Sequence, residues 1–195
     1  EKDVLDKTTV ICSSNRDVSW WNKVLRERLG FSGSLVTGDM VTTQANWFGK
    51  NTCIYKGDAG IIRAIDSHVE TYADLQFVDA EIEFGGETGG KQVVTTKVLL
   101  ESLNTDSGRL TLEQESNLFS KVMQHNAAFR DSKKPGDDKY LGAMRLRHGY
   151  ATTCHKAQGG EWDKTILHPF YPKHDLRWLY TAVTRARQEV YSWAA

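Results

Sequence analysis

The sequence has few of the features that mark secreted, membrane or metal-binding proteins. Its three cysteines, Cys12, Cys53 and Cys154, are far apart and have no CxxC spacing, which argues against a disulfide framework and against a metal site. No apolar run approaches the roughly 20 residues that a membrane-spanning helix needs. The N-terminal EKDVLDKTTV also lacks the apolar core of a signal peptide. We therefore expect a cytoplasmic protein with reduced thiols, no metal site and no membrane association.

The chain also lacks an excess of charge of either sign. Its 195 residues carry 25 Lys+Arg and 25 Asp+Glu, and 39% of them are hydrophobic, as in ordinary globular domains. Residues 130–195 hold 12 Lys+Arg against 7 Asp+Glu, whereas residues 1–129 hold 13 against 18. A net charge of zero argues against a protein that binds nucleic acid over its whole surface. Because an initiator methionine is missing, we expect a part of a longer protein.

Helix and strand patterns predict one α/β domain that is interrupted by an insertion. TTVICSS (residues 8–14) is typical of a buried parallel strand, and the next apolar positions predict a helix that Asn15 or Asp17 caps and Gly30 ends. After the insertion, the pattern predicts strands over 150–154 and 164–168, a helix over 175–187 and a strand over 189–193. We assign residues 1–34 and 147–195 to this α/β domain.

The insertion, residues 35–146, consists largely of short alternating runs separated by Gly, Asn and Asp. This pattern predicts a small antiparallel β-barrel. Residues 111–130 have apolar positions at helical spacing, and Thr111 with Gln114 predicts a capping box at the start of that helix.

One stretch of the insertion matches the sequence pattern of a phosphate-binding loop. GGETGGK (residues 85–91) satisfies the GxxxxGK pattern, but Gln92 stands where a Ser or Thr would bind Mg²⁺. Such a loop must also open a helix, whose N-terminus holds the phosphate. The β-branched run QVVTTKVLL predicts a strand instead. We therefore interpret GGETGGK as a hairpin turn, and no apolar run ending in Asp-Glu completes an ATP site elsewhere.

The stretch GYATTCHKAQGGEW (residues 149–162) places polar side chains directly after a predicted buried strand. The carboxyl ends of such strands are where open α/β sheets bind ligands. Thr153 and His155 are suited to hydrogen-bond a nucleic-acid phosphate, and Lys156 adds positive charge. The alternative interpretation of these residues is a polar loop with an exposed His-Lys pair.

The second half of the same stretch, Gln158 to Glu161, is a turn with two glycines. Gly159 and Gly160 permit a close approach of a ligand to the backbone. The carboxylate of Glu161 is an acceptor for a nucleotide ribose hydroxyl. Glu161 is therefore a candidate nucleotide-binding residue.

LYTAVTRAR (residues 179–187) combines an amphipathic helical pattern with two arginines. Apolar residues of this segment can pack on the sheet and leave Arg185 or Arg187 to reach a ligand. A guanidinium directed at a γ-phosphate stabilises the charge that develops in phosphoryl transfer, an effect worth about 10³–10⁵ in rate. We assign this role to Arg185 and a structural role to Arg187. An exposed arginine that only complements the helix dipole is the alternative.

Together these motifs resemble a known family. GYATTCHKAQGGEW and RWLYTAVTRAR look like motifs V and VI of RecD-like superfamily 1 DNA helicases. CSSNRDVSWWNKVLRERL (residues 12–29) is similar to motif IV, at the start of their second RecA-like domain. VTGDMVTTQANW and YKGDAGII, within residues 36–62, resemble the SH3-like barrel inserted in that domain. Related helicases of the other polarity often carry an arginine where this chain has Ser13, so a second arginine finger is not expected.

The resemblance implies a fold, an activity and roles for single residues. The fold is a RecA-like parallel-sheet domain with an SH3-like insertion, and the activity is ATP-driven 5′→3′ movement on single-stranded DNA. Thr153, His155 and Lys156 would contact the strand. The residues that couple the strand to the nucleotide would be Gln158, Gly160 and Glu161. Arg185 would complete an ATP and Mg²⁺ site whose other half, an N-terminal RecA-like domain, is not in this sequence.

Two questions stay open at the level of the sequence. Trp47, Phe48 and Tyr55 lie near Lys50 and Lys56, so they either stack on bases or fill the core of the barrel. The chain can also be a passive nucleic-acid-binding module without motor activity. An α/β metabolic enzyme or nuclease is disfavoured, because no carboxylate cluster or nucleophile has a usable spacing.

Overall fold

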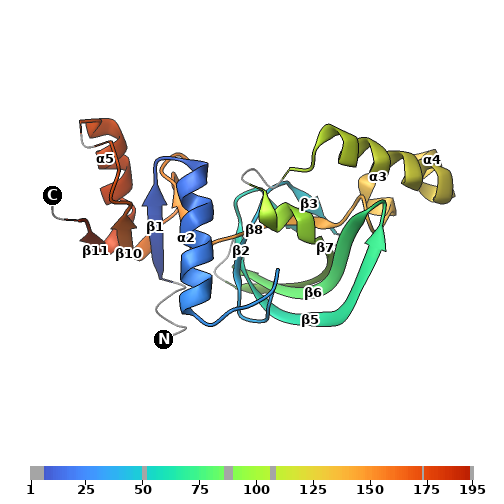
Figure 1. Cartoon of the computed structure of the whole chain (residues 1–195), viewed down its shortest axis with the longest axis horizontal. Coiled ribbons are helices and arrows are strands. Elements are labelled where there is room, and N and C mark those ends of the chain that lie inside the picture. Colours follow the sequence, from blue (N-terminus) through green and yellow to red (C-terminus); the bar gives the residue numbers. More distant parts are fainter. Residues whose placement is uncertain (1–6, 50–51, 86–89, 106–108, 173, 194–195) are drawn as a thin grey trace. The chain divides into compact units, whose positions relative to one another are not determined.

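The computed structural model describes residues 7–49, 52–85, 90–105, 109–172 and 174–193. The chain forms two compact units (Figure 1). The sheet unit comprises Glu1–Phe31 and Gly149–Ala195, and the barrel unit comprises Ser32–His148. Within the described ranges, no helix is both long enough and apolar enough to cross a membrane.

The sheet unit is built on four parallel strands in the order β11-β10-β1-β9. Its elements are β1 (Thr8–Cys12), α2 (Asn15–Arg28), β9 (Ala151–Thr153), β10 (Trp162–Leu167), α5 (Leu176–Val183) and β11 (Ala186–Tyr191). Since this unit has a parallel sheet and the insertion forms a closed barrel of five strands, the predicted fold class is confirmed.

Helices cover both faces of this sheet. Side chains alternate between the two faces along a strand. Val10 and Cys12 of β1 pack in a cluster with residues of α2, whereas Ile11 packs in a different cluster with Trp178 and other residues of α5. β1 is therefore buried on both sides, which explains its continuous apolar sequence.

The structure corrects how α2 begins. The sequence predicts Asn15 or Asp17 as the cap, but Ser14 is the N-cap residue: its backbone is extended and its Oγ accepts a hydrogen bond from the Asp17 backbone N–H at 3.2 Å. Gly30 follows the C-cap with a φ of +74°, which glycine adopts without strain, and this part of the prediction is confirmed.

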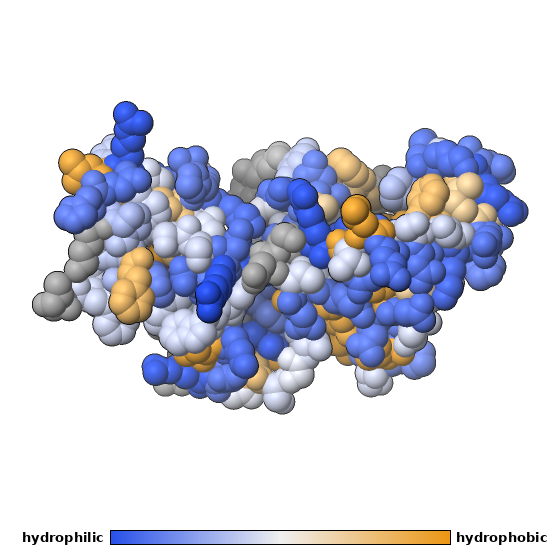
Figure 2. Space-filling view, turned by 45° about the horizontal axis from the view of Figure 1, so that its top comes forward, coloured by the Kyte–Doolittle hydropathy of each residue, from blue (hydrophilic) through white to orange (hydrophobic). Residues whose placement is uncertain are grey.

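The barrel unit contains a closed barrel with the strand order β2-β5-β6-β7-β8. Its strands are β2 (Met40–Thr43), β5 (Ala59–Tyr72), β6 (Leu75–Gly85), β7 (Lys91–Leu99) and β8 (Met144–His148). A short hairpin of β3 (Trp47–Phe48) and β4 (Cys53–Ile54) is separate from it, and the 3₁₀ helices are η1 (Leu100–Asn104) and η2 (Pro135–Asp137). Inward-facing residues such as Ile62, Ile82 and Leu146 are fully buried. The surface seen in Figure 2 is mainly hydrophilic, with isolated apolar patches.

The single helix predicted over residues 111–130 is in fact two helices, α3 (Leu112–His125) and α4 (Ala127–Ser132). The break lies at Asn126, which ends α3 and caps α4 by accepting a hydrogen bond from the Phe129 backbone N–H at 3.1 Å. An Asn side chain competes with helical backbone bonding in this way. At the other end, the capping box of Thr111 and Gln114 is confirmed.

The residues that follow the GxxxxGK match form a strand, as predicted. β6 ends at Gly85 and β7 begins at Lys91, and these two residues are antiparallel partners. Residues 86–89, where the sequence predicts a hairpin turn, lie outside the described residues. The amino group of Lys91 is 2.9 Å from a carboxylate oxygen of Glu83, and Gln92 lies within β7. A strand here does not supply the helix N-terminus that a phosphate loop requires.

A charged network crosses the outside of strands β5, β6 and β7. Lys97 is 7% exposed, and its amino group is 2.8 Å from Glu70 and 2.9 Å from Asp79. Glu70 also accepts hydrogen bonds from Lys139 and from the Tyr140 hydroxyl, both at 2.8 Å. These bonds, that of Lys139 first, lower the pKa of Glu70 from 4.5 to about 2. The Glu70 carboxylate thus links three chain segments in its ionised form.

We expect Glu70→Gln to destabilise the protein at pH 7 and to have less effect in acid. A lowered folded-state pKa gives stability that is complete above about pH 4.5 and is lost as the pH falls toward about 2. Thermal unfolding midpoints of the wild type and the variant should therefore converge over that range. Glu113→Gln, at an exposed position of α3, is the control and should leave the midpoints unchanged. A difference between wild type and Glu70→Gln that does not depend on pH would contradict this account.

Candidate functional site

Two of the predicted motifs meet at the amino-terminal ends of the parallel strands. We call this side the amino edge of the sheet, and the side of the carboxyl-terminal strand ends the carboxyl edge. Glu161 directly precedes β10 and Arg185 directly precedes β11, and these strands are parallel neighbours in which Trp162 pairs with Ala186. The Trp162 backbone N–H donates to the Arg185 carbonyl at 2.9 Å. The strand register therefore places the residues before the two strands side by side.

The guanidinium of Arg185 is held by neutral oxygens. Its Nη1 donates to the Gly160 carbonyl at 3.3 Å, its Nε to the Thr181 carbonyl at 3.2 Å and its Nη2 to the Thr184 hydroxyl at 3.1 Å. Arginine has five N–H donors, so one N–H remains on each terminal nitrogen. Among the residues that the structure describes, no carboxylate forms an ion pair with Arg185. Its half-buried positive charge is oriented but not neutralised.

The helix that carries this motif is shorter than predicted. The sequence predicts a helix over 175–187, whereas α5 ends at Val183, Arg185 follows the helix and Arg187 lies in β11. The hydroxyl of Thr184 donates to the carbonyl of Tyr180 at 2.8 Å and caps the last turn. From Ala186 onward, the backbone pairs with β10 instead. Pairing in the sheet thus overrides the helical pattern of the sequence.

Glu161 lies next to Arg185 in the fold but contacts the other arginine. Its carboxylate accepts from Nε of Arg187 at 3.0 Å, and both side chains are more than half exposed. An exposed ion pair of this kind is worth about 0–1 kcal/mol, since solvent screens it. The Glu161 carboxylate can therefore exchange this partner for a ligand at little cost.

The residues predicted to bind single-stranded DNA lie at the opposite, carboxyl edge of the sheet. Thr153 ends β9 and is 8% exposed, whereas His155 and Lys156 are exposed in the turn that follows. The Thr153 hydroxyl accepts from the Lys156 backbone N–H at 3.4 Å, which is a long contact. His155 and Lys156 are thus exposed to solvent, whereas Thr153 is buried.

The turn from Thr153 to Gly160 connects the two edges through backbone hydrogen bonds. The Ala157 N–H donates to the Thr153 carbonyl at 2.9 Å, and the Gly160 N–H donates to the Ala157 carbonyl at 3.0 Å. The Gly160 carbonyl then accepts from Arg185. Gln158 is exposed within this turn. A series of three hydrogen bonds therefore runs from the end of β9 to the Arg185 guanidinium.

The structure explains why the two glycines of this turn are glycines, which the sequence did not reveal. Gly159 has a φ of +84°, where other residues are strained, and a Cβ on Gly160 would lie 2.6 Å from the Trp162 ring. Both glycines are explained by the path of the backbone and by packing. A close approach of a ligand, which the sequence suggested, is not needed to explain them.

An aromatic cluster at the carboxyl edge was missed at the level of the sequence. The Trp21 Nε1–H donates to Nδ1 of His168 at 2.9 Å, and the rings of Trp20 and Phe170 lie edge-on to Trp21 and His168 respectively. Trp20 is 55% exposed and Phe170 is 84% exposed. His168 directly follows β10 and Thr153 ends β9, so these aromatic residues share an edge with the turn of His155. His168 directly follows a strand, which is a signal in the sequence, whereas Trp20 and Trp21 lie within α2.

Residues 148–191 match the family model of the UvrD-like helicase C-terminal domain. This range contains β9, the turn, β10, α5 and β11. No curated protein sequence matches the chain.

Solved structures of helicases share the fold. The Pif1 helicase from Candida albicans is 11% identical, with a TM-score of 0.57 over 97% of this chain and 45% of that chain. A Pif1 helicase in a structure of DNA unwinding at forked double-stranded DNA is 18% identical, with a TM-score of 0.50 over 99% of this chain and 42% of that chain. The chain thus spans less than half the length of these structures. The family match is confined to residues 148–191, the solved structures show a shared fold, and neither singles out the RecD-like branch.

We expect Gly160→Ala to destabilise the protein, because the new Cβ meets the Trp162 ring at 2.6 Å. Forcing extra volume into packed surroundings costs about 1–3 kcal/mol. The measurement is the urea midpoint of unfolding, followed by tryptophan fluorescence. Gly85→Ala is the control, since nothing lies within 4 Å of its added Cβ, and it should change stability by less than about 0.5 kcal/mol. Equal effects of the two changes would disprove the packing role.

Proposed function

We propose that this chain is the C-terminal half of an ATP-dependent 5′→3′ DNA helicase of the RecD-like branch. In this proposal it binds single-stranded DNA and contributes Arg185 to an ATP site that it shares with an N-terminal RecA-like domain of the same protein. The observation that carries the proposal is the Arg185 guanidinium, which is fixed at the sheet edge by neutral oxygens and has no carboxylate partner among the described residues.

The electrostatics of Arg185 suit a phosphate ligand. A guanidinium paired with a carboxylate must give up that partner before it can bind an anion, and Arg185 has no such pair to break within the described part of the chain. Its two remaining N–H groups can bind two oxygens of one phosphate, the geometry that arginine favours. Because the hydrogen bonds to Gly160, Thr181 and Thr184 fix the group beforehand, it need not reorganise when charge develops on the γ-phosphate.

The rest of the ATP site must come from another domain. Lys91 of the GxxxxGK match is paired with Glu83, and Gln92 lies in a strand, so this segment is not suited to hold phosphates or Mg²⁺. An N-terminal RecA-like domain would hold the ATP and Mg²⁺. Gln158, Gly160 and Glu161 would then lie near the nucleotide together with Arg185.

The single strand would contact Thr153, His155 and Lys156 at the carboxyl edge. The backbone hydrogen bonds from Thr153 through Ala157 to Gly160 give a physical route by which a bound DNA strand can influence the orientation of the Arg185 guanidinium. A change in the turn that moves the Gly160 carbonyl removes one of the three bonds that orient the guanidinium. This coupling is what distinguishes a motor from a passive binding module.

We expect Arg185→Ala, in a protein that joins this chain to its ATPase domain, to lower ATP turnover about 10³-fold or more. The affinity for single-stranded DNA should change less than about twofold, because Arg185 lies at the other edge of the sheet from the turn of His155. Arg187→Ala is the matched control: it removes a neighbouring arginine whose exposed ion pair contributes little, and turnover should persist. Unchanged turnover in Arg185→Ala would remove this assignment.

We expect this chain alone to bind oligothymidine, with affinity that decreases as salt increases. Each phosphate that is neutralised on a single strand adds about 0.7 to the slope of log affinity against log salt. Lys156→Ala should therefore reduce the slope by about 0.7, whereas Lys23→Ala, an exposed lysine of α2, should not. Fluorescence anisotropy at several salt concentrations measures both. A slope that is the same in Lys156→Ala and in the wild type would exclude Lys156 from the strand site.

A further inference from the structure

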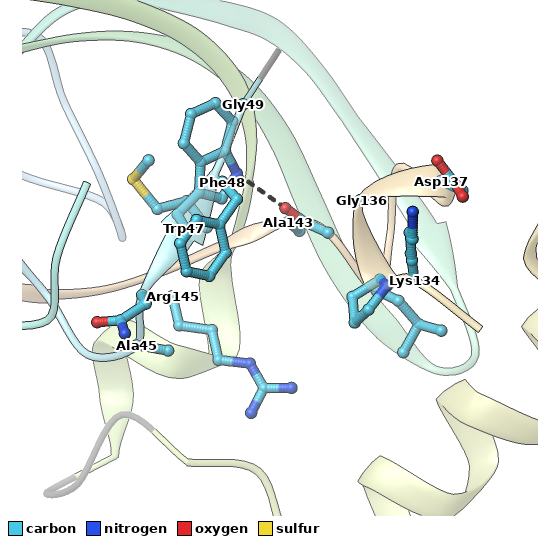
Figure 3. A pocket seen from close by; sticks show the side chains of 14 residues that line it. Ala45, Trp47, Phe48, Gly49, Lys134, Gly136, Asp137, Ala143 and Arg145 are labelled. Carbon is cyan, nitrogen blue, oxygen red and sulfur yellow. Dashed lines mark hydrogen bonds between the residues drawn. The ribbon is translucent and has the colours of Figure 1, made fainter. Parts of the chain in front are cut away.

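The barrel unit contains a cavity that the proposed function leaves unused. Its volume is about 650 Å³, which lies within the range of about 300–1,000 Å³ for small-molecule sites. Figure 3 shows Trp47 and Phe48 of the β3 hairpin on one side, and Lys134, Gly136 and Asp137 of the η2 segment on the other. All of these residues belong to the barrel unit.

The two aromatic residues on β3 lie in different surroundings, one against the barrel core and the other exposed. Trp47 is partly buried against the barrel core, and its Nε1–H donates to the Gly142 carbonyl at 3.0 Å. A Cβ on Gly49 would lie 2.6 Å from the Trp47 ring, so the hairpin packs tightly around this side chain. Phe48, by contrast, is 63% exposed at the cavity. Trp47 therefore anchors the hairpin, and Phe48 presents a free aromatic face.

The opposite wall is also fixed before any ligand binds. The Asp138 carboxylate accepts from the backbone N–H groups of Tyr140 at 2.8 Å and Leu141 at 2.9 Å. A Cβ on Gly142 would lie 2.8 Å from the Asp138 carbonyl, so the backbone passes through a space that only glycine fits. A wall of this kind does not need to reorganise when a ligand binds, which reduces the cost of binding.

One lysine at the cavity carries a positive charge that no described residue compensates. The Lys134 amino group forms no hydrogen bond or ion pair with the residues that the structure describes. Arg145, another lining residue, is bound by both oxygens of Glu115 at 2.5 and 2.9 Å, so its charge is already compensated. Lys134 is therefore the cation available to a ligand phosphate, and it lies across the cavity from the exposed ring of Phe48 (Figure 3).

We propose that this cavity binds one unpaired base of a DNA single strand, which stacks on Phe48 while a neighbouring phosphate contacts Lys134. An exposed aromatic ring beside a free cation is the combination by which proteins hold single strands without reading their sequence. The proposal rests on the proposed function in one respect, namely that the chain binds single-stranded DNA. It adds a second contact for the strand, on the barrel unit.

The test compares intact oligothymidine with the same strand carrying abasic sites, both bound to the 195-residue chain. Base stacking on an aromatic residue is worth about 1–3 kcal/mol, so Phe48→Ala should weaken binding of the intact strand about 5- to 150-fold. The same change should leave the binding of the abasic strand unaltered. Phe48→Trp should restore most of the affinity for the intact strand. Lys134→Ala should weaken both strands equally and reduce the salt slope by about 0.7.

Phe119→Ala is the matched control, because Phe119 of α3 is also a phenylalanine, is 48% exposed and does not line the cavity. It should leave both affinities unchanged. Crosslinking of 5-iodouracil-containing strands, followed by peptide mapping, should identify the Trp47–Phe48 peptide. Binding that is intact in Phe48→Ala for both strands, or crosslinks confined to the sheet unit, would overturn this proposal and leave the proposed function standing. A chain that binds no single strand at all would contradict the proposed function itself.

Discussion

The hydrogen bond between Nη1 of Arg185 and the Gly160 carbonyl is the contact on which the site depends. It joins two motifs that are 25 residues apart in the sequence. Parallel pairing of β10 with β11 makes the contact possible, because it brings the residue before each strand to the same edge. Had α5 continued through Arg187, as its sequence pattern predicts, the guanidinium would point along a helix and not across to the turn. The end of the helix at Val183 is therefore a functional feature as well as a local one.

An arginine without a carboxylate partner has a cost in a folded protein, since burying part of a charge removes some of its hydration. At Arg185 this cost is limited by partial exposure and by three neutral acceptors. The neighbouring Glu161 instead binds Arg187 at the surface. The two arginines of the motif thus have different electrostatic surroundings although only one residue separates them. Arg187 has a carboxylate partner, and Arg185 has none among the described residues.

Much of the architecture follows from patterns in the sequence. The apolar run of β1, the capping box at Thr111 and the strand after Gly90 are local features, and each is confirmed. The errors have one tertiary cause and one local cause. Helix α5 stops because its next residues pair with β10, and the helix over 111–130 breaks because Asn126 caps a second helix. The aromatic cluster of Trp21 and His168 was not predicted, because its members are 147 residues apart and meet only through strand order.

In the turn from Thr153 to Gly160, the exposed polar side chains and the residues that fix the backbone are different residues. Its exposed side chains, His155, Lys156 and Gln158, make none of the backbone bonds that run from Thr153 to Gly160. These side chains can therefore be substituted without removing any of these hydrogen bonds. Gly159 and Gly160 fix the backbone itself, one through its positive φ and the other through the Trp162 ring. The mixture of polar residues and glycines in this short stretch thus has a physical reason: the polar side chains are exposed to solvent, and the glycines fix the path of the backbone.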